Sequence, residues 1–471
     1  MLDFAIFAVT FLVALVAAII YLYPSSGKRT TVPGLDPITK EDGNLSDIER
    51  AGSLHEFLLD LHKQFGDITS FWMGRELVIS IASPELFKQQ QTIFDRPPSL
   101  CKLFEPLFTN ESIQFSNGSD GRSRRQDYDK GFSHDELNSF YDDMNKVASD
   151  LTKTLESKVK DEHLSLNQYM FAFAFKIVMT SLMGKGVMNE KEILDFKSNY
   201  DHAWSEMEQR LADPNIPDDD SQRGKAFNRV LKHLKDSVTK IMRYRKKHGS
   251  KSEEYLLIDR IMDHTENDDT VYADILTYLV GGFHTTGNLL TWAFYFLATH
   301  KEVEKKLVKE IKQVLGDDDI DQENSTKLKY TRQVLDETLR CAVVAPWAAR
   351  FQDFDSELGG HKIPKNTPVI HALGVMLHDE KYWPLPNKFD PDRFNEENIK
   401  NRPNLAFSPF GFAGKRICPG NKFAYMEATI CLVSLIRKFE FTLVDGQVVQ
   451  PKYGLVGHPE DDIWVTLSKR K

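Results

Sequence analysis

The chain has 471 residues, of which 41% are apolar, 11% aromatic and 27% charged, a composition typical of a folded globular protein and not of a disordered or collagen-like chain. Its formal net charge of −9 disfavours nucleic acid as a partner, because the overall field repels phosphate. The cysteines form no Cys-x-x-Cys pair and no pattern typical of zinc sites or disulfide frameworks, which indicates a reducing compartment.

The first predicted element is a membrane-spanning helix. Residues Phe4–Tyr23 carry no charge over 20 positions, and a helix of that length spans about 30 Å. Asp3 lies upstream and Lys28 and Arg29 lie downstream, which is unlike a cleaved signal peptide and leaves the rest of the chain in the cytosol. We therefore predict a transmembrane anchor over residues 1–23. The alternative is a cleaved leader on a secreted enzyme, in which four sequons would be available for N-glycosylation: Asn44, Asn110, Asn117 and Asn324.

Beyond the anchor, the sequence predicts a hinge over residues 24–46 and one folded catalytic domain over residues 47–471. Pro24–Pro37 is rich in Pro, Gly and Ser, which favours a linker. The acidic runs Asp213–Asp220 and Gly316–Ser325 lie between helical patterns, so we expect them to be solvated loops within the domain.

The domain is predicted to be mainly α with a small β portion. Strand patterns occur at Asp67–Trp72 and Glu76–Ala82, and again around Gly359–Met376. Val271–His300 is strongly apolar, but the polar run Gly281–Asn288 at its centre favours a buried helix over a second membrane span. Two glycines and polar residues in a core helix indicate that a ligand approaches its backbone, and a bent core helix is the alternative.

A loop in the last third carries the strongest chemical signal. In Ser408–Gly420, Cys418 lies just ahead of a segment with helical apolar spacing, where a helix N-terminus can stabilise a thiolate. Arg416 is placed to meet a carboxylate of a bound ligand. Three glycines let the backbone pass close to a flat ligand: Gly411, Gly414 and Gly420. Such a loop is typical of a site that holds haem iron by a single thiolate, whereas a buried structural thiol is the alternative for Cys418 alone.

This loop resembles the haem-binding loop of the cytochrome P450 monooxygenases, and two further motifs of that family stand in the expected order. Glu337-Thr-Leu-Arg340 resembles the family's Glu-x-x-Arg, and Phe389–Phe394, with Arg393, resembles its aromatic-Pro-Arg segment. Because Glu337 and Arg340 share one helix face, we expect them to form a buried structural network with Arg393. The resemblance implies the cytochrome P450 fold, haem b as the cofactor and Cys418 as the axial ligand of its iron.

Several segments resemble cytochrome P450 family 20 in particular. They are the opening MLDFAIFAVTF, Gly52–Phe57, the stretch ALGVMLHDEKYWP and Phe423–Met426. Members of that family are regarded as orphans, so this resemblance implies no substrate.

Two departures from the wider family pattern bear on the mechanism. Gly411 stands where an aromatic residue is expected seven positions before the cysteine, so either Phe410 or Phe412 is expected to pack beside the haem. In the long apolar helix, Thr285 keeps the family's alcohol, whereas His284 replaces its acid. Thr285 is the candidate for delivering protons to dioxygen, and His284 is either a proton relay or a core histidine satisfied by hydrogen bonds.

Four arginines are candidates for the haem propionates: Arg124, Arg125, Arg350 and Arg416. The family's Trp-x-x-x-Arg motif would place tryptophan at residue 121, where this chain has Gly121, while Arg125 fills the arginine position. One contact to a haem carboxylate is therefore expected to be lost. The alternative for residues 122–125 is a solvated charge run.

Electrons are expected to come from a partner, because the chain has no Gly-x-Gly-x-x-Gly fingerprint and no Walker loop. Residues 401–438 hold six basic residues and one acid, Glu427, which suits docking of an acidic donor. The resemblance implies NADPH–cytochrome P450 reductase as the donor, with cytochrome b5 as a second one. It also implies a single-pass protein of the endoplasmic reticulum membrane with its catalytic domain on the cytosolic side.

These features predict a membrane-anchored haem-thiolate monooxygenase that hydroxylates a small apolar molecule with dioxygen and two external electrons. A haem-binding carrier or sensor, or a rearrangement enzyme, is a second hypothesis, which the departures at Gly121, His284 and Gly411 favour. A membrane-tethered structural protein without cofactor is a third, which a folded but colourless preparation would support.

Overall fold

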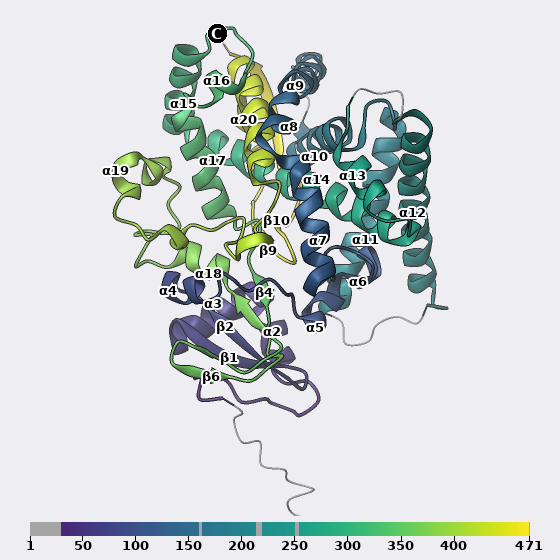
Figure 1. The fold of residues 1–471 in the computed structure, drawn as a ribbon. Helices are drawn as coiled ribbons and strands as arrows, with labels where there is room; N and C mark the ends of the chain where they lie inside the picture. Colours follow the sequence, from purple (N-terminus) through teal and green to yellow (C-terminus); the bar gives the residue numbers. More distant parts are fainter. Residues whose placement is uncertain (1–29, 160–162, 213–218, 250–253, 471) are drawn as a thin grey trace, which may run out of the picture.

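The computed structural model describes residues 30–159, 163–212, 219–249 and 254–470, and it confirms a mainly α fold with a small β portion. Helices form the larger part, and the main sheet lies in a smaller lobe at the end where the described chain begins (Figure 1). Within those ranges no helix is long and apolar enough to cross a bilayer. The predicted anchor over residues 1–23 lies outside the described residues.

A four-stranded sheet in the order β1-β2-β7-β4 forms the β lobe. Its strands are rich in β-branched and aromatic residues, and the first two lie within one residue of the predicted strands. β1 (Ile68–Met73) pairs antiparallel with β2 (Glu76–Ile81), which runs parallel to β7 (Val369–His371). β4 (Ala348–Arg350) pairs antiparallel with β7 and carries Arg350 toward the helical part.

The folded body begins before the predicted boundary at residue 47. The N–H of Ser70 in β1 donates to the Pro33 carbonyl over 2.8 Å. Asn44 is buried, and its side-chain oxygen accepts the N–H of Trp72 over 2.8 Å. The first described residues therefore pack against the sheet and do not form a free hinge.

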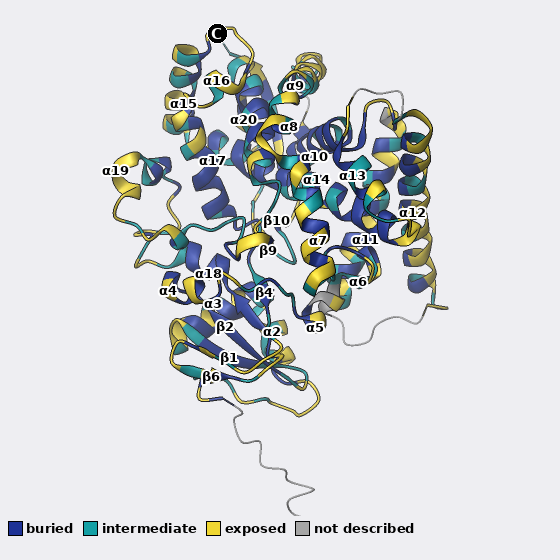
Figure 2. Cartoon of the chain, viewed as in Figure 1, coloured by how far each residue is buried: buried dark blue, intermediate teal, exposed yellow. Residues whose placement is uncertain are grey.

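The 32-residue helix α14 (Asp268–Thr299) runs through the core of the helical part. Asn267 caps it by accepting the N–H of Asp269, and most of its residues are buried (Figure 2). It packs against α10 (Leu166–Val178), α17 (Lys329–Ala342) and α20 (Asn421–Lys438). The prediction of a buried helix in a folded domain is therefore confirmed.

The remaining described elements are short or peripheral. The other α-helices are α2 (Leu45–Ala51), α3 (Leu54–Phe65), α4 (Pro84–Gln89), α5 (Pro98–Cys101), α6 (Glu105–Phe108), α7 (Gly118–Tyr128), α8 (His134–Ser139), α9 (Tyr141–Glu156), α11 (Glu190–Ala212), α12 (Gln222–His248), α13 (Leu257–His264), α15 (Lys301–Val314), α16 (Gln322–Ser325), α18 (Leu373–His378) and α19 (Glu396–Ile399). The other strands are β3 (Leu164–Ser165), β5 (Ser356–Leu358), β6 (His361–Ile363), β8 (Phe439–Leu443), β9 (Pro451–Tyr453), β10 (Gly457–Pro459) and β11 (Trp464–Lys469). The predicted acidic loop Gly316–Ser325 therefore ends in a four-residue helix, α16.

Candidate active site

A cavity of about 390 Å³ brings together the two segments that the sequence singled out. From α14, its wall includes Gly281, Gly282, Thr285 and Thr286. From the loop before α20, it includes Phe410, Gly411, Arg416, Cys418 and Gly420. Much of the remaining wall is apolar, and no Asp or Glu is among the described residues that line it. Segments more than a hundred residues apart therefore form one site.

Cys418 lines this cavity three residues before the first residue of α20. Its N–H donates to the Phe410 carbonyl over 3.0 Å, which closes the loop. Burial raises the pKa of the thiol, while the N–H of Gly420 and the charge of Arg125 act to lower it. A thiol held beside an amide donor and a cation, at an apolar cavity, is suited to be a soft metal ligand.

Four arginines line the same cavity: Arg96, Arg125, Arg350 and Arg416. Burial and then the charges of the other three lower the pKa of Arg416 to about 8. Its Nε atom is buried without a hydrogen-bond partner in the described part of the chain. Arg125 is paired with the carboxylate of Asp129 at 2.8 Å. Because no Asp or Glu is among the described residues that line the cavity, the charged side chains of its wall are all positive, which suits an anionic ligand.

These observations fit haem as the group for which the cavity is built. The thiol offers a single iron ligand, and the apolar walls match the porphyrin ring. The arginines match two carboxylates, and the unpartnered Nε of Arg416 is an available donor for one of them.

Thr285 and His284 are neighbours on α14 with different surroundings. Thr285 lines the cavity, and its hydroxyl donates to the Gly281 carbonyl over 2.9 Å. His284 is not among the cavity-lining residues; its Nδ1 lies 2.7 Å from the Tyr200 hydroxyl, and its ring lies edge-on to Trp204. Burial lowers the pKa of His284 to about 3, so the ring is neutral at pH 7. This placement favours the core histidine over the proton relay.

The two phenylalanines of the loop separate. Phe410 lines the cavity, as expected for one of the pair. Phe412 stacks instead on Phe87, with ring centroids 4.4 Å apart, and on His371, in an apolar cluster beneath the sheet. This placement favours Phe410 as the residue beside the cofactor, because the Phe412 side chain joins the loop to the β lobe.

The glycines also divide by role. Gly420 lines the cavity, whereas Gly414, which was also predicted to lie beside the cofactor, is not among its lining residues. Gly414 has a φ of 49°, and a Cβ there would lie 2.9 Å from the Gln91 carbonyl oxygen, so it serves the turn. At Gly121, a Cβ would lie 2.3 Å from the Ser116 carbonyl oxygen. A tryptophan cannot occupy this position, because the preceding turn fills its space.

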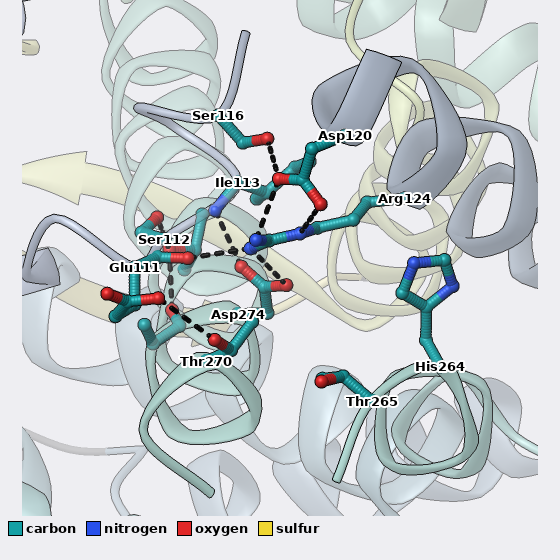
Figure 3. Close-up of polar contacts among 12 residues, drawn as sticks. Glu111, Ser112, Ile113, Ser116, Asp120, Arg124, His264, Thr265, Thr270 and Asp274 are labelled. Carbon is teal, nitrogen blue, oxygen red and sulfur yellow. Dashed lines mark hydrogen bonds and ion pairs between the residues drawn. The ribbon is translucent and has the colours of Figure 1, made fainter. Parts of the chain in front are cut away.

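Arg124 is the one predicted propionate ligand that does not line the cavity. Its guanidinium pairs with Asp120 at 2.8 Å and with Asp274 at 3.4 Å, in a polar cluster behind the cavity wall (Figure 3). Arg124 and Arg125 are both buried, so the alternative of a solvated charge run does not hold for them.

The predicted network at the end of α17 is formed in the structure. Glu337 and Arg340 are fully buried and share two hydrogen bonds of 2.7 and 2.8 Å. Arg393 lies 3.3 Å from the same carboxylate, and the Asp390 N–H donates to it over 2.8 Å. Arg340 also donates to the Leu377 carbonyl over 3.2 Å. These contacts join α17 to the segment that leads into the cysteine loop.

Sequence reasoning missed several cavity residues. Arg96 gives only a weak signal, a lone arginine before two prolines, and Thr286 directly follows the predicted Thr285. Trp347 lies in an irregular stretch before β4 and gives no signal of a ligand site.

The chain belongs to the cytochrome P450 family, whose haem is held by a cysteine thiolate: the family described as Cytochrome P450 matches residues 35–465. It is 38% identical to bovine (Bos taurus) and 37% identical to human (Homo sapiens) proteins named Cytochrome P450 20A1, over the full length of each chain. It is also 29% identical to a mouse (Mus musculus) protein named Cytochrome P450 4V2, over 75% of this chain and 73% of that protein. The protein is thus an oxidoreductase of the haem-thiolate monooxygenase class.

Proposed function

We propose that this protein is a membrane-anchored monooxygenase that hydroxylates a small apolar molecule, with Cys418 as the residue that would hold the iron of haem b. The observation that carries the proposal is the meeting of Cys418, Thr285 and four arginines at one mainly apolar cavity. The absence of acidic side chains among its described lining residues favours an uncharged, apolar substrate. Phe104 and Trp347 offer it aromatic surface.

Haem, when bound, supplies the activation of dioxygen for insertion of one oxygen atom into a C–H bond. The chain's own residues bind and orient the reactants. Arg350 and Arg416 would hold the carboxylates, and Phe410 would pack beside the ring. Thr285 would turn its hydroxyl from the Gly281 carbonyl toward the cavity and pass a proton there, because a hydroxyl both accepts and donates.

The electron donor is proposed to be NADPH–cytochrome P450 reductase, with cytochrome b5 as an alternative donor. Glu427, the single acid between residues 401 and 438, is fully buried. Three lysines of that segment are exposed: Lys415, Lys422 and Lys438. The exposed charge of this segment is therefore all positive, which favours an acidic partner.

Thr285→Ala tests the monooxygenase function. We expect the variant to consume NADPH with the reductase but to release about tenfold more peroxide per NADPH, because proton delivery by a positioned group contributes factors of this order or larger. The measurement is peroxide formed against NADPH oxidised.

Thr299→Ala is the matched control for that experiment. Thr299 lies on the same helix and its hydroxyl makes the same type of bond, to the Tyr295 carbonyl over 3.0 Å, but it does not line the cavity. An unchanged peroxide fraction in Thr285→Ala would instead favour a haem carrier, a sensor or a rearrangement enzyme.

Membrane anchoring is tested by removing residues 1–23. The full chain is expected in the endoplasmic reticulum fraction and to resist extraction with carbonate, because an uncharged, mainly apolar span of 20 residues is held by the bilayer core. The truncated chain is expected to be extracted. Carbonate extraction of the full chain would contradict the anchor.

A further inference from the structure

A turn of six residues, Glu111–Ser116, forms part of the cavity wall between α6 and α7. Ile113, Gln114 and Phe115 from this turn line the cavity. The turn contains no regular helix or strand, so its position depends on contacts with its neighbours. Whatever holds the turn therefore sets the shape of the substrate chamber.

The turn lies unusually close to α7. The Ser116 carbonyl oxygen occupies the place that a Cβ at residue 121 would need, so only glycine fits there. This close approach coincides with the departure of Gly121 from the family pattern. The fixed position of the turn is thus a feature of this chain's own sequence.

The carboxylate of Asp274 on α14 is the centre of the contacts that hold the turn (Figure 3). Its Oδ1 accepts the Ile113 N–H over 2.6 Å, and its Oδ2 accepts the Tyr128 hydroxyl over 2.9 Å. Arg124 lies 3.4 Å from Oδ2 and donates to the Glu111 carbonyl over 2.6 Å. One carboxylate therefore links α14, α7 and the turn.

Two further contacts support the same attachment. The hydroxyls of Ser112 and Thr277 lie 2.7 Å apart, and Thr270 donates to the Glu111 side chain over 3.1 Å. Arg416 also donates to the turn, through Nη1 to the Ile113 carbonyl over 3.0 Å and through Nη2 to the Ser116 carbonyl. Its Nε remains available to a carboxylate of the cofactor.

Asp274 is costly to bury. It is fully inaccessible to solvent, and burial raises its pKa to about 6 although Arg124, the Ile113 N–H and Tyr128 act to lower it. A neutral side chain would have a smaller desolvation penalty at this position. A carboxylate that is buried in spite of this penalty indicates a positioning role.

We propose that Asp274 is a positioning residue that clamps the Glu111–Ser116 turn and thereby sets the size of substrate that the cavity admits. The inference rests on the proposed function only in taking the cavity as the substrate site. Its test does not use turnover, so its failure would leave the monooxygenase function standing.

The first test is hydrogen–deuterium exchange of the haem-bound protein in Asp274→Ala. Exchange of the peptide covering residues 109–117 is expected to rise about tenfold, because the loss of a hydrogen bond to a charged group has an effect of this size. Asp274→Asn, which keeps an oxygen for the Ile113 N–H but loses the charge, is expected to give a smaller rise. If Asp274→Ala fails to fold, the exchange of the same peptide is measured in Asp274→Asn alone.

Asp336→Ala is the matched control. Asp336 is also a buried aspartate held by an arginine and a tyrosine, with Arg332 at 3.0 Å and the Tyr425 hydroxyl at 2.5 Å. It does not line the cavity, and none of these contacts involves the turn. Its replacement is expected to leave exchange of residues 109–117 unchanged. Unchanged exchange in the Asp274 variants would overturn the clamp.

The second test measures the size that the chamber admits. Imidazole and 4-phenylimidazole are titrated spectroscopically as iron ligands, and the ratio of their dissociation constants is compared between wild type and Asp274→Asn. In Asp274→Asn, the dissociation constant of 4-phenylimidazole is expected to fall about threefold or more relative to that of imidazole. An unchanged ratio together with faster exchange would make Asp274 a purely structural residue and overturn the proposal.

Discussion

Replacing Cys418 by serine is expected to abolish the strongly red-shifted Soret band that we expect the reduced wild-type protein to give with carbon monoxide. The band depends on a thiolate that pushes electron density onto the iron, and a serine hydroxyl does not supply it. Cys418 lies at the cavity beside the Gly420 N–H and Arg125, which both favour the thiolate. The measurement is the difference spectrum of the purified variant, together with its haem content.

Cys431→Ala is the control for that variant. Cys431 is a second free cysteine, fully buried on α20, and it does not line the cavity. This variant is expected to keep the band of the wild type. A band at the position typical of histidine-ligated haem in the wild type would contradict thiolate ligation and favour the carrier or sensor hypothesis.

The sequence predicted the parts of the site that depend on local pattern. The cysteine loop, the helix after it and the pairing of Glu337 with Arg340 follow from short spacings, and the structure has each of them. The central helix was also predictable, because its length and apolar content exceed what a strand or loop carries.

The parts that the sequence left open depend on direction and on distant contacts. Successive residues of a helix point about 100° apart, so Thr285 faces the cavity while His284 faces Tyr200 and Trp204. The sequence shows both residues but not which one points inward. Gly121 is explained only by a contact with the backbone of the turn before it, whose path no local pattern reveals.

Phe412 shows the same limit in a loop. Phe410 and Phe412 flank Gly411 symmetrically in the sequence, and either could have replaced the expected aromatic residue. Gly411 has a φ of 78°, which turns the chain between them. Phe412 then reaches Phe87 in the β lobe, while Phe410 stays at the cavity.

Glu337→Gln is expected to lower the free energy of unfolding by about 3–5 kcal/mol, because it leaves the buried guanidinium of Arg340 without its counter-charge. This is a large fraction of the total stability of about 5–15 kcal/mol for a typical domain. Glu337 also accepts the Asp390 N–H, so the variant is expected to loosen the segment that leads to the cysteine loop and to lose haem. Urea denaturation of the haem-bound protein and haem content measure both effects.

Lys329→Met is the control on the same helix. Lys329 pairs with Glu396 at 2.5 Å, but the two side chains are 69% and 78% exposed, so the loss is expected to be far smaller than that of Glu337→Gln, because ion pairs between exposed side chains contribute little to stability. The double variant Glu337→Leu with Arg340→Met removes both buried charges together. Its free energy of unfolding is expected to fall by less than the sum of the losses in Glu337→Leu and Arg340→Met, since the double variant leaves neither charge buried without the other. Additive losses would show that the two side chains act independently and that the pair does not hold the helix to the cysteine loop.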